Sequence, residues 1–488
     1  MKRKPIRRDG CAGKDFRNVL RKGLSIGLVL FFLSGCAAVG PDFVRPEIPL
    51  PDEWKAEGEG GLVEGEPDPE ALAAWWTVLE DPTLTGLIEG ALEGNLDLEE
   101  ARARIREARA RRGISGADRF PTLDASGSYT SSHSSENAGT GDRSELFALG
   151  FDAGWEIDLF GGVRRAIEAY EADLEASRED YQDVLVSLVA EVALNYVELR
   201  TSQARLATAE ANLAAQAETY ELAGFRAEAG LASALDVEQA RYNLESTKAQ
   251  IPTLRTELVA AENRLAVLLG ECPGHVNERL AGPASIPVAR LEIAVGVPAQ
   301  VLGRRPDVRR AEQELVAQTA RVGEATAELY PKITLFGSIG LESLSAGDLF
   351  TGGSWAESFG PGISWPVFQA GSIRKNIEVQ DALQEQALLR YESAVLAALE
   401  EVENAMTAYA EEQLRRASLL EASRAAERAV DLALNQYASG LIDFQDVLDA
   451  QRSLLTFQDQ LASSEGTVTS DLIRLYKALG GGWTTLES

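Results

Sequence analysis

The side chains of this 488-residue chain that are best suited to covalent or metal chemistry are three cysteines and two histidines. Cys272 and His275 have the spacing of half a zinc site, but no second pair of ligands follows them. The sequence contains no P-loop, no G-x-S-x-G and no H-E-x-x-H motif. We therefore expect that the protein is not an enzyme and holds no metal and no bound cofactor. Cys272 is interpreted as an isolated loop thiol.

Cys36 is set apart by the sequence that precedes it. Nine Lys and Arg residues within the first 23 positions are followed by the apolar run 24–33 and then by Ser34, Gly35 and Cys36. The ten positions of that run are too few for a helix that spans a bilayer. They therefore predict a signal peptide, residues 1–35.

The residues from Leu33 to Cys36 resemble the signal box of bacterial lipoproteins. This resemblance implies that Cys36 becomes the first residue of the mature chain and carries a covalent diacylglycerol and an N-acyl chain such as palmitate. Ordinary cleavage nearby is the alternative. Ala37, in place of Asp, resembles lipoproteins that are sent on to the outer membrane. Because Cys11 would leave with the signal and Cys36 would be acylated, Cys272 would have no partner for an intrachain disulfide.

The chain is strongly acidic, with a net charge of −29 that becomes −36 once the signal peptide, at +7, is removed. A nucleic-acid partner is disfavoured, because phosphate contacts need clusters of basic residues. The acidity fits a pore lining that favours cations, and it equally fits solvated helices kept soluble by Glu.

One supersecondary unit occurs twice, at a constant offset of 210 positions, from about residue 97 to residue 270 in the first copy. The matching pairs are Pro121 and Pro331, Gly127 and Gly337, Trp155 and Trp365, Arg164 and Arg374, Tyr181 and Tyr391, Gly230 and Gly440, Asp236 and Asp446, and Gly270 and Gly480. Whatever structure the first copy forms, the second is therefore expected to repeat.

Each copy contains two segments in which apolar and polar residues alternate, the pattern of a β-strand. In 147–159 the odd positions are apolar, from Phe147 to Leu159, and the segments 122–130, 332–342 and 354–367 keep the same parity. One interpretation is a soluble sheet with one face on a core. We favour strands of a transmembrane β-barrel with apolar residues toward lipid, because each segment is close to the length that crosses the hydrocarbon layer.

A barrel requires several chains. Four strands cannot close a barrel, and an open sheet edge in lipid leaves backbone groups without hydrogen bonds. Two chains would give eight strands with a filled interior, whereas three would give twelve and leave a lumen. A homotrimer is therefore the smallest assembly that could conduct.

Long helical patterns follow each strand pair. No proline occurs between Val163 and Ala229, and this stretch would make a rod of roughly 100 Å. Apolar residues recur every seven positions in it and in the segments that follow, as in a coiled coil. Pro121 and Pro331 are expected to turn the preceding short helices, about 96–119 and 306–329, into strands.

Together these segments resemble the outer membrane factor family, the TolC-like efflux channels, and more closely its lipoprotein branch that serves resistance-nodulation-division pumps. The residues that carry the resemblance are Cys36 to Asp42, Trp75 and Trp76, Asp81 to Leu84, Ala91 to Leu98, Trp155 to Gly161, and Arg304 to Val308. The family implies a trimer in which four strands per chain complete a 12-stranded barrel in the outer membrane, continuous with a periplasmic α-helical barrel. It also implies docking on a periplasmic adaptor and an inner-membrane pump.

The resemblance implies a gate at the periplasmic helix tips. Gly230 and Gly440 would form the tip turns and contact the adaptor together with Asp236. Asp446 and Asp449 lie where the family narrows its tunnel with rings of aspartate, and a simpler interpretation is that they are first-turn acids of a helix. The family's first member closes its tip with an Arg at the position of Ile442, so the closed state of this chain must be held in another way.

We accordingly expect a passive exit duct, with a non-conducting periplasmic tether lipoprotein as the alternative. The expected segments are the signal peptide 1–35; a lipidated N-terminal and equatorial segment 36–95; a first repeat 96–270 with strands 122–130 and 147–159, a long helix 163–229 and a returning helix 235–269; an equatorial linker 271–305; a second repeat 306–480 with strands 332–342 and 354–367, a long helix 373–439 and a returning helix 445–479; and a tail 481–488.

Overall fold

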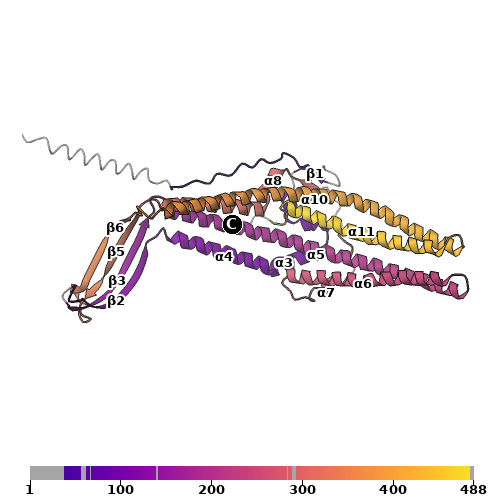
Figure 1. Ribbon diagram of the computed structural model, residues 1–488, viewed down its shortest axis with the longest axis horizontal. Coiled ribbons are helices and arrows are strands. Elements are labelled where there is room, and N and C mark those ends of the chain that lie inside the picture. Colours follow the sequence, from indigo (N-terminus) through magenta and orange to yellow (C-terminus); the bar gives the residue numbers. More distant parts are fainter. Residues whose placement is uncertain are drawn as a thin grey trace, which may run out of the picture. The chain divides into compact units, whose positions relative to one another are not determined.

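The computed structural model describes residues 38–55, 62–65, 68–138, 141–282, 284–287 and 293–483 (Figure 1). The chain divides into two compact units. The first, which we call the sheet unit, comprises the residues up to Pro46, Glu107–Glu175 and Gln313–Leu389. The second, the helical unit, comprises Glu47–Arg106, Ala176–Glu312 and Arg390–Ser488. Each unit therefore takes equivalent pieces from both sequence repeats.

The sheet unit contains one antiparallel sheet of four strands in the order β2-β3-β5-β6 (Figure 1). Its strands are β2 (Thr122–His133), β3 (Arg143–Ile157), β5 (Lys332–Ser343) and β6 (Trp355–Ser364). The register pairs odd residues with odd residues on every interface, for example Ala125 with Phe151 and Phe151 with Ile339. The apolar parity of the sequence therefore forms one continuous face.

The first hairpin is longer than its apolar alternation predicts. The ladder continues past position 130 because polar side chains pair across it: the hydroxyl oxygens of Ser132 and Ser144 are 2.9 Å apart, and Arg143 Nε donates to Ser131 Oγ at 3.3 Å. β6, in contrast, ends at Ser364, before the predicted limit of 367.

The two copies form helices of equal length. The long helices α5 (Gly162–Glu228) and α10 (Ser372–Ala438) have 67 residues each. The returning helices α6 (Ala234–Leu268) and α11 (Phe444–Ala478) have 35, and the short helices α4 (Leu96–Ala117) and α9 (Pro306–Ala327) have 22. Among the described residues, no helix has both the length and the apolar composition that crossing a membrane requires.

The equatorial segments join the two repeats within the helical unit. Here β1 (Leu62–Glu64) pairs in parallel with β4 (Ile293–Val295), and short helices surround the pair. These helices are α2 (Pro69–Ala73), η1 (Trp75–Leu79), α3 (Pro82–Gly94), α7 (Asn277–Leu280) and α8 (Pro298–Arg304). Trp75, 1% exposed, stacks on Tyr476 at 5.5 Å between ring centroids, within the main hydrophobic core.

Candidate channel gate and membrane-facing sheet

The turns between long and returning helices begin with a glycine that has a left-handed backbone. Gly230 has φ +72° and Gly440 has φ +71°. In each turn the next N–H reaches back to a helix carbonyl, from Leu231 to Arg226 and from Leu441 to Gln436. This hydrogen-bond pattern and the positive φ explain why both copies have Gly there.

Asp236 and Asp446 occupy equivalent places in the first turns of α6 and α11, but they are used differently. Asp236 belongs to a capping box, in which Ser233 N–H donates to its carboxylate at 2.9 Å and its own N–H donates to Ser233 Oγ at 3.2 Å. The N-cap of α11, Asp443, makes no side-chain capping bond. The exposed Asp446 carboxylate makes no hydrogen bond or ion pair to the described residues.

Asp449 is exposed one turn further along α11 and is held from its own helix. Arg452 Nη1 lies 3.1 Å from Asp449 Oδ1, and Gln445 Nε2 donates to the same oxygen at 3.0 Å. Arg452 also donates to Asn243 on α6 and to the Tyr242 hydroxyl, with its guanidinium 5.2 Å from the centre of the Tyr242 ring. One arginine thus connects the Asp449 carboxylate to the neighbouring returning helix.

Tyr242 and Arg452 are equivalent positions of the two repeats, separated by the offset of 210. Sequence reasoning missed this contact. The replacement of an aromatic residue by an arginine at one repeat position was the available signal.

The position that lacks the family's Arg belongs to an apolar cluster at the tip. Ile442 packs against the group formed by Ala223, Ala240, Ala433, Tyr437, Phe444, Val447 and Leu448, which come from all four long and returning helices. Burial raises the pKa of Tyr437, and the Arg226 guanidinium, 4.4 Å from its ring centre, opposes that rise. At the tip, Ile442 therefore packs in an apolar cluster whose Tyr437 also makes a cation–π contact with Arg226.

Large apolar side chains are exposed around both tip turns. Leu231 is 69% exposed and Leu441 is 74% exposed, directly after the two glycines. Phe225 and Leu235 are exposed beside the first turn. Such a concentration at the end of a helical hairpin is typical of a protein-binding surface.

The apolar face of the sheet is uncovered by the rest of the described chain. Leu123, Phe151, Ile339 and Phe359 are between 43% and 88% exposed. The opposite face is polar, with Ser126 Oγ donating to Asp152 at 2.9 Å and the Ser338 and Ser358 hydroxyl oxygens 2.9 Å apart. This distribution contradicts a soluble sheet packed on a core and agrees with lipid on the odd face.

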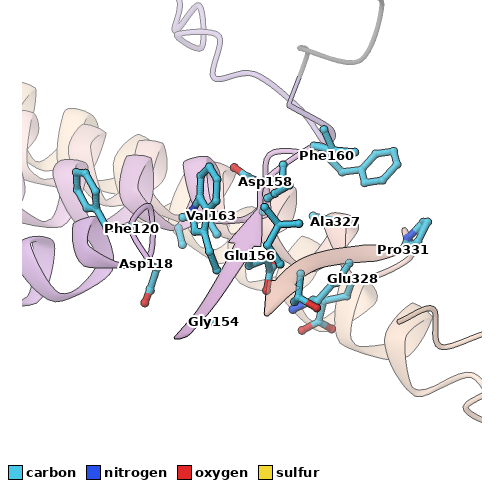
Figure 2. Close-up of a pocket in the computed structure, with 18 of the residues that line it drawn as sticks. Asp118, Phe120, Gly154, Glu156, Asp158, Phe160, Val163, Ala327, Glu328 and Pro331 are labelled. Atoms are coloured by element: carbon cyan, nitrogen blue, oxygen red, sulfur yellow. The ribbon is translucent and has the colours of Figure 1, made fainter. Parts of the chain in front are cut away.

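A cavity of about 500 Å³ lies where the strands meet the helices (Figure 2). Figure 2 shows carboxylates of Asp118 and Glu328, just after α4 and α9, in the same region as Glu156 and Asp158 of the β3 end. Burial raises the pKa of Glu324, which also lines this cavity. Five carboxylate residues and one basic residue, Lys332, therefore line this cavity.

Cys36 and the predicted signal peptide lie outside the described residues. Cys272 is an exposed free thiol. Arg305 and Asp307 belong to one of the segments that carry the family resemblance, and both have a structural role. Arg305 is 8% exposed, donates to Asp307 at 2.9 Å and to Glu401 at 2.6 Å, and binds the Ala478 carbonyl at the end of α11.

A duplicated chain with an uncovered amphipathic sheet and paired 67-residue helices has the architecture of an outer-membrane efflux channel. The chain belongs to the outer membrane efflux protein family, whose model matches residues 87–271 and 297–481. The second range is the first moved by 210 residues, the offset of the internal repeat.

The relatives extend over nearly the full chain. Nodulation protein T of Rhizobium leguminosarum bv. trifolii is 33% identical over 92% of this chain and 95% of its own length. The solvent efflux pump outer membrane protein SrpC of Pseudomonas putida is 32% identical over 94% and 98%. The solved structure of the outer-membrane channel OprN has a TM-score of 0.87 at 37% identity, over 92% of this chain and 100% of that one.

The predicted fold class, the channel function and the outer-membrane location with a periplasmic tunnel are thereby confirmed. Family membership favours the channel over the non-conducting tether, and the members of this family are channels rather than enzymes.

Proposed function

We propose that three copies of this chain close one barrel and work as the passive exit duct of a tripartite pump, without a catalytic centre of their own. The observation that carries this proposal is the combination of an apolar, uncovered sheet face with two open edges, β2 and β6. In lipid, unpaired edge groups cost several kcal/mol each, so the edges of neighbouring copies must pair.

The internal repeat supports a specific register for that pairing. β6 and β2 are the repeat equivalents of β3 and β5, whose paired residue numbers sum to 490, as in Trp155 with Leu335. β6 is the equivalent of β3 at residue numbers higher by 210, and β2 is the equivalent of β5 at residue numbers lower by 210. The paired residue numbers of β6 in one copy and β2 in the next would therefore also sum to 490. Ser364 would then face Ser126, and Ser358 would face Ser132.

Disulfide cross-linking tests this register. Four serines are replaced by cysteine in pairs, in a chain whose exposed Cys272 is first replaced by alanine. Ser126→Cys with Ser364→Cys and Ser132→Cys with Ser358→Cys should form intermolecular disulfides, because paired residues are about 4.5–5.5 Å apart. The exchanged combinations, Ser126→Cys with Ser358→Cys and Ser132→Cys with Ser364→Cys, are six residues out of register, about 20 Å, and should not. Equal cross-linking of matched and exchanged pairs would rule out this closure.

Charge complementarity supports the same neighbour. Within the chain, Arg310 on α9 pairs with Asp180 on α5 at 2.7 Å. The equivalent positions on α4 and α10 are Glu100 and Arg390, with the signs reversed and both side chains exposed. In a trimer with repeated geometry, Glu100 of one copy would meet Arg390 of the next.

We propose that Asp446 and Asp449 form the periplasmic gate. Asp446 is free of partners among the described residues, and Asp449 is bound only by groups of α11. Three copies would bring these carboxylates near one axis, where they would attract cations and repel one another. Single-channel currents of Asp446→Ala and Asp449→Ala variants test this role.

The tips are the proposed docking surface for the periplasmic adaptor and, through it, an inner-membrane transporter of the resistance-nodulation-division type. The turns at Gly230 and Gly440 expose Leu231 and Leu441, and Asp236 fixes the start of α6 beside them. The double substitution Leu231→Ser and Leu441→Ser should abolish binding of the adaptor without changing trimer formation.

Cys36 is proposed to carry the lipid. The sulfur would hold diacylglycerol through a thioether, and the amino group freed by cleavage after Gly35 would hold the N-acyl chain, adding an anchor in outer-membrane lipid. The mass of the N-terminal peptide tests this directly.

A further inference from the structure

The described N-terminal residues are bound tightly at the strand–helix junction of the sheet unit. We call Ala38–Asp42 the strap. Val39 N–H donates to the Phe160 carbonyl at 3.0 Å, just before α5 begins. Arg165 on α5 returns two contacts, from Nε to the Val39 carbonyl at 3.2 Å and from Nη2 to Asp42 at 2.6 Å. The Arg165 side chain is 5% exposed, so its guanidinium is buried between the strap and α5.

Glycines make the strap's close approach possible. A Cβ on Gly40, which has φ +90°, would lie 2.4 Å from Gly323 Cα, and one on Gly161 would lie 2.5 Å from Ala38 Cβ. The equivalents of Gly161 and Gly323 in the other repeat, Gly371 and Gly113, have open space around them. The glycines are shared by both repeats, but within the described part of the chain a strap binds at one of the two junctions.

An apolar groove of about 480 Å³ begins a few residues from the strap's attachment. It lies mainly on the odd face of the sheet, between Ala153, Trp155, Leu335, Gly337, Phe359 and Pro361. Phe160, whose carbonyl binds the strap, lines the junction cavity together with Trp155 and Leu335, so this cavity connects the strap's attachment to two residues of the groove. The Trp155 indole N–H donates to the Arg119 carbonyl at 2.9 Å, which fixes one wall.

Distance allows a lipid on Cys36 to reach this groove. Cys36 is two residues from Ala38, about 7 Å of chain at most. Phe160 and Trp155 are separated by five residues, at most ~17 Å, and an acyl chain that fills one leaflet extends about 15 Å.

We propose that this groove seats one acyl chain of the lipidated Cys36 of the same chain, and that the strap, held by Arg165, positions it. The inference rests on the proposed lipidation of Cys36. In this proposal the lipid does more than anchor the chain in the membrane: one of its acyl chains also binds to the outward face of the barrel of the same chain.

Photo-cross-linking in the outer membrane tests the site. The photoreactive amino acid p-benzoylphenylalanine replaces Phe359 in the groove or, as the control, Trp355, which shares its strand and face but lies four residues, about 13 Å, further from the junction. After irradiation, the N-terminal lipopeptide should be attached to the peptide with position 359 at least five-fold more than to that with position 355. Equal yields, or phospholipid adducts alone at 359, overturn the proposal.

The Arg165 contacts are tested in the same assay. Arg165→Gln should lower the lipopeptide adduct at 359 several-fold, whereas Lys375→Gln, at the equivalent position of the other repeat, should leave it unchanged. Asp42→Asn removes one contact from an exposed residue, so it tests the strap even if Arg165→Gln fails to fold. An unchanged adduct in Asp42→Asn and Arg165→Gln overturns the positioning role.

The mass of the N-terminal peptide before irradiation separates the two claims. An unlipidated Cys36 would overturn both the lipidation and the groove site. A lipidated Cys36 with no adduct at 359 would overturn the groove site alone.

Discussion

The two repeats of this channel have the same secondary structure, but equivalent side chains make different contacts. At the tip of the first repeat, Asp236 forms a capping box, while its equivalent in the second repeat, Asp446, has no side-chain partner among the described residues. Tyr242 of the first repeat receives Arg452, its equivalent in the second. The two repeats therefore share their helix lengths but differ in the polar contacts at their tips, and the proposed gate residues lie in the second repeat.

The same contrast occurs at the other end of the returning helices. Asn95 Nδ2 donates to the Leu268 carbonyl at 2.9 Å, and its equivalent, Arg305, donates to the equivalent Ala478 carbonyl at 2.9 Å. Arg305 adds Asp307 and Glu401 as partners. One contact with the helix end is thus conserved in geometry, but only the second repeat builds an ionic network on it.

The largest expected effect comes from breaking that network. Arg305→Ala should lower the free energy of unfolding by about 3 kcal/mol, because two carboxylates lose a partner inside the helical unit. Asn95→Ala, which removes one buried amide, should cost about 1–2 kcal/mol. Thermal unfolding followed by circular dichroism should rank the variants in that order. Equal losses would mean that the ionic network adds nothing.

Lowering the pH should remove the contribution of the Asp307 carboxylate to the stability of the protein. Burial acts to raise the pKa of Asp307, but the hydrogen bond and charge of Arg305 lower it below the ordinary value of 3.8. A carboxylate with a lowered folded pKa stabilises the protein above its unfolded pKa, and this is lost as the pH falls through the folded pKa. Asp307→Asn should therefore be less stable than the parent at pH 6 and equal to it well below pH 3.8. If the two proteins still differ in stability in strong acid, the effect of the substitution is due to packing and not to the charge of Asp307.

A smaller effect, of opposite sign, is expected at Gln216 on α5. Its side chain is 3% exposed, and neither amide atom has a hydrogen-bond partner among the described residues. The equivalent position of the second repeat is Ala426. Gln216→Leu, which keeps the volume and removes the unpaired amide, should stabilise the protein by about 1 kcal/mol. A lower melting temperature would indicate that the amide is paired in the assembled channel.

The sequence predicted the repeated elements well because strong periodicity defined them. Strand parity, the helix breaks at Gly230 and Gly440 and the turns at Pro121 and Pro331 are local signals, and the observed elements begin or end within a few residues of them. The first hairpin was predicted too short because serine pairs, which carry no apolar signal, extend its ladder.

Contacts between distant segments could not be predicted. The link from Arg452 to Tyr242 depends on how two returning helices face each other, and the strap depends on backbone hydrogen bonds and glycine packing. The change from Tyr242 to Arg452 between the repeats marks the position but does not say which residue it contacts, and the strap leaves no pattern along the chain. The place of Ile442 in an apolar cluster likewise became visible only when four helices were brought together.

Ion current through the purified protein in planar bilayers tests the central claim most directly. The parent should give small, cation-selective openings, since the carboxylates of Asp446 and Asp449 line the proposed constriction. Asp446→Ala with Asp449→Ala should raise the conductance and weaken cation selectivity several-fold, whereas Asp236→Ala, which removes a cap, should change neither. Trimers that insert but pass no current, in the parent and in the double variant alike, would contradict the account.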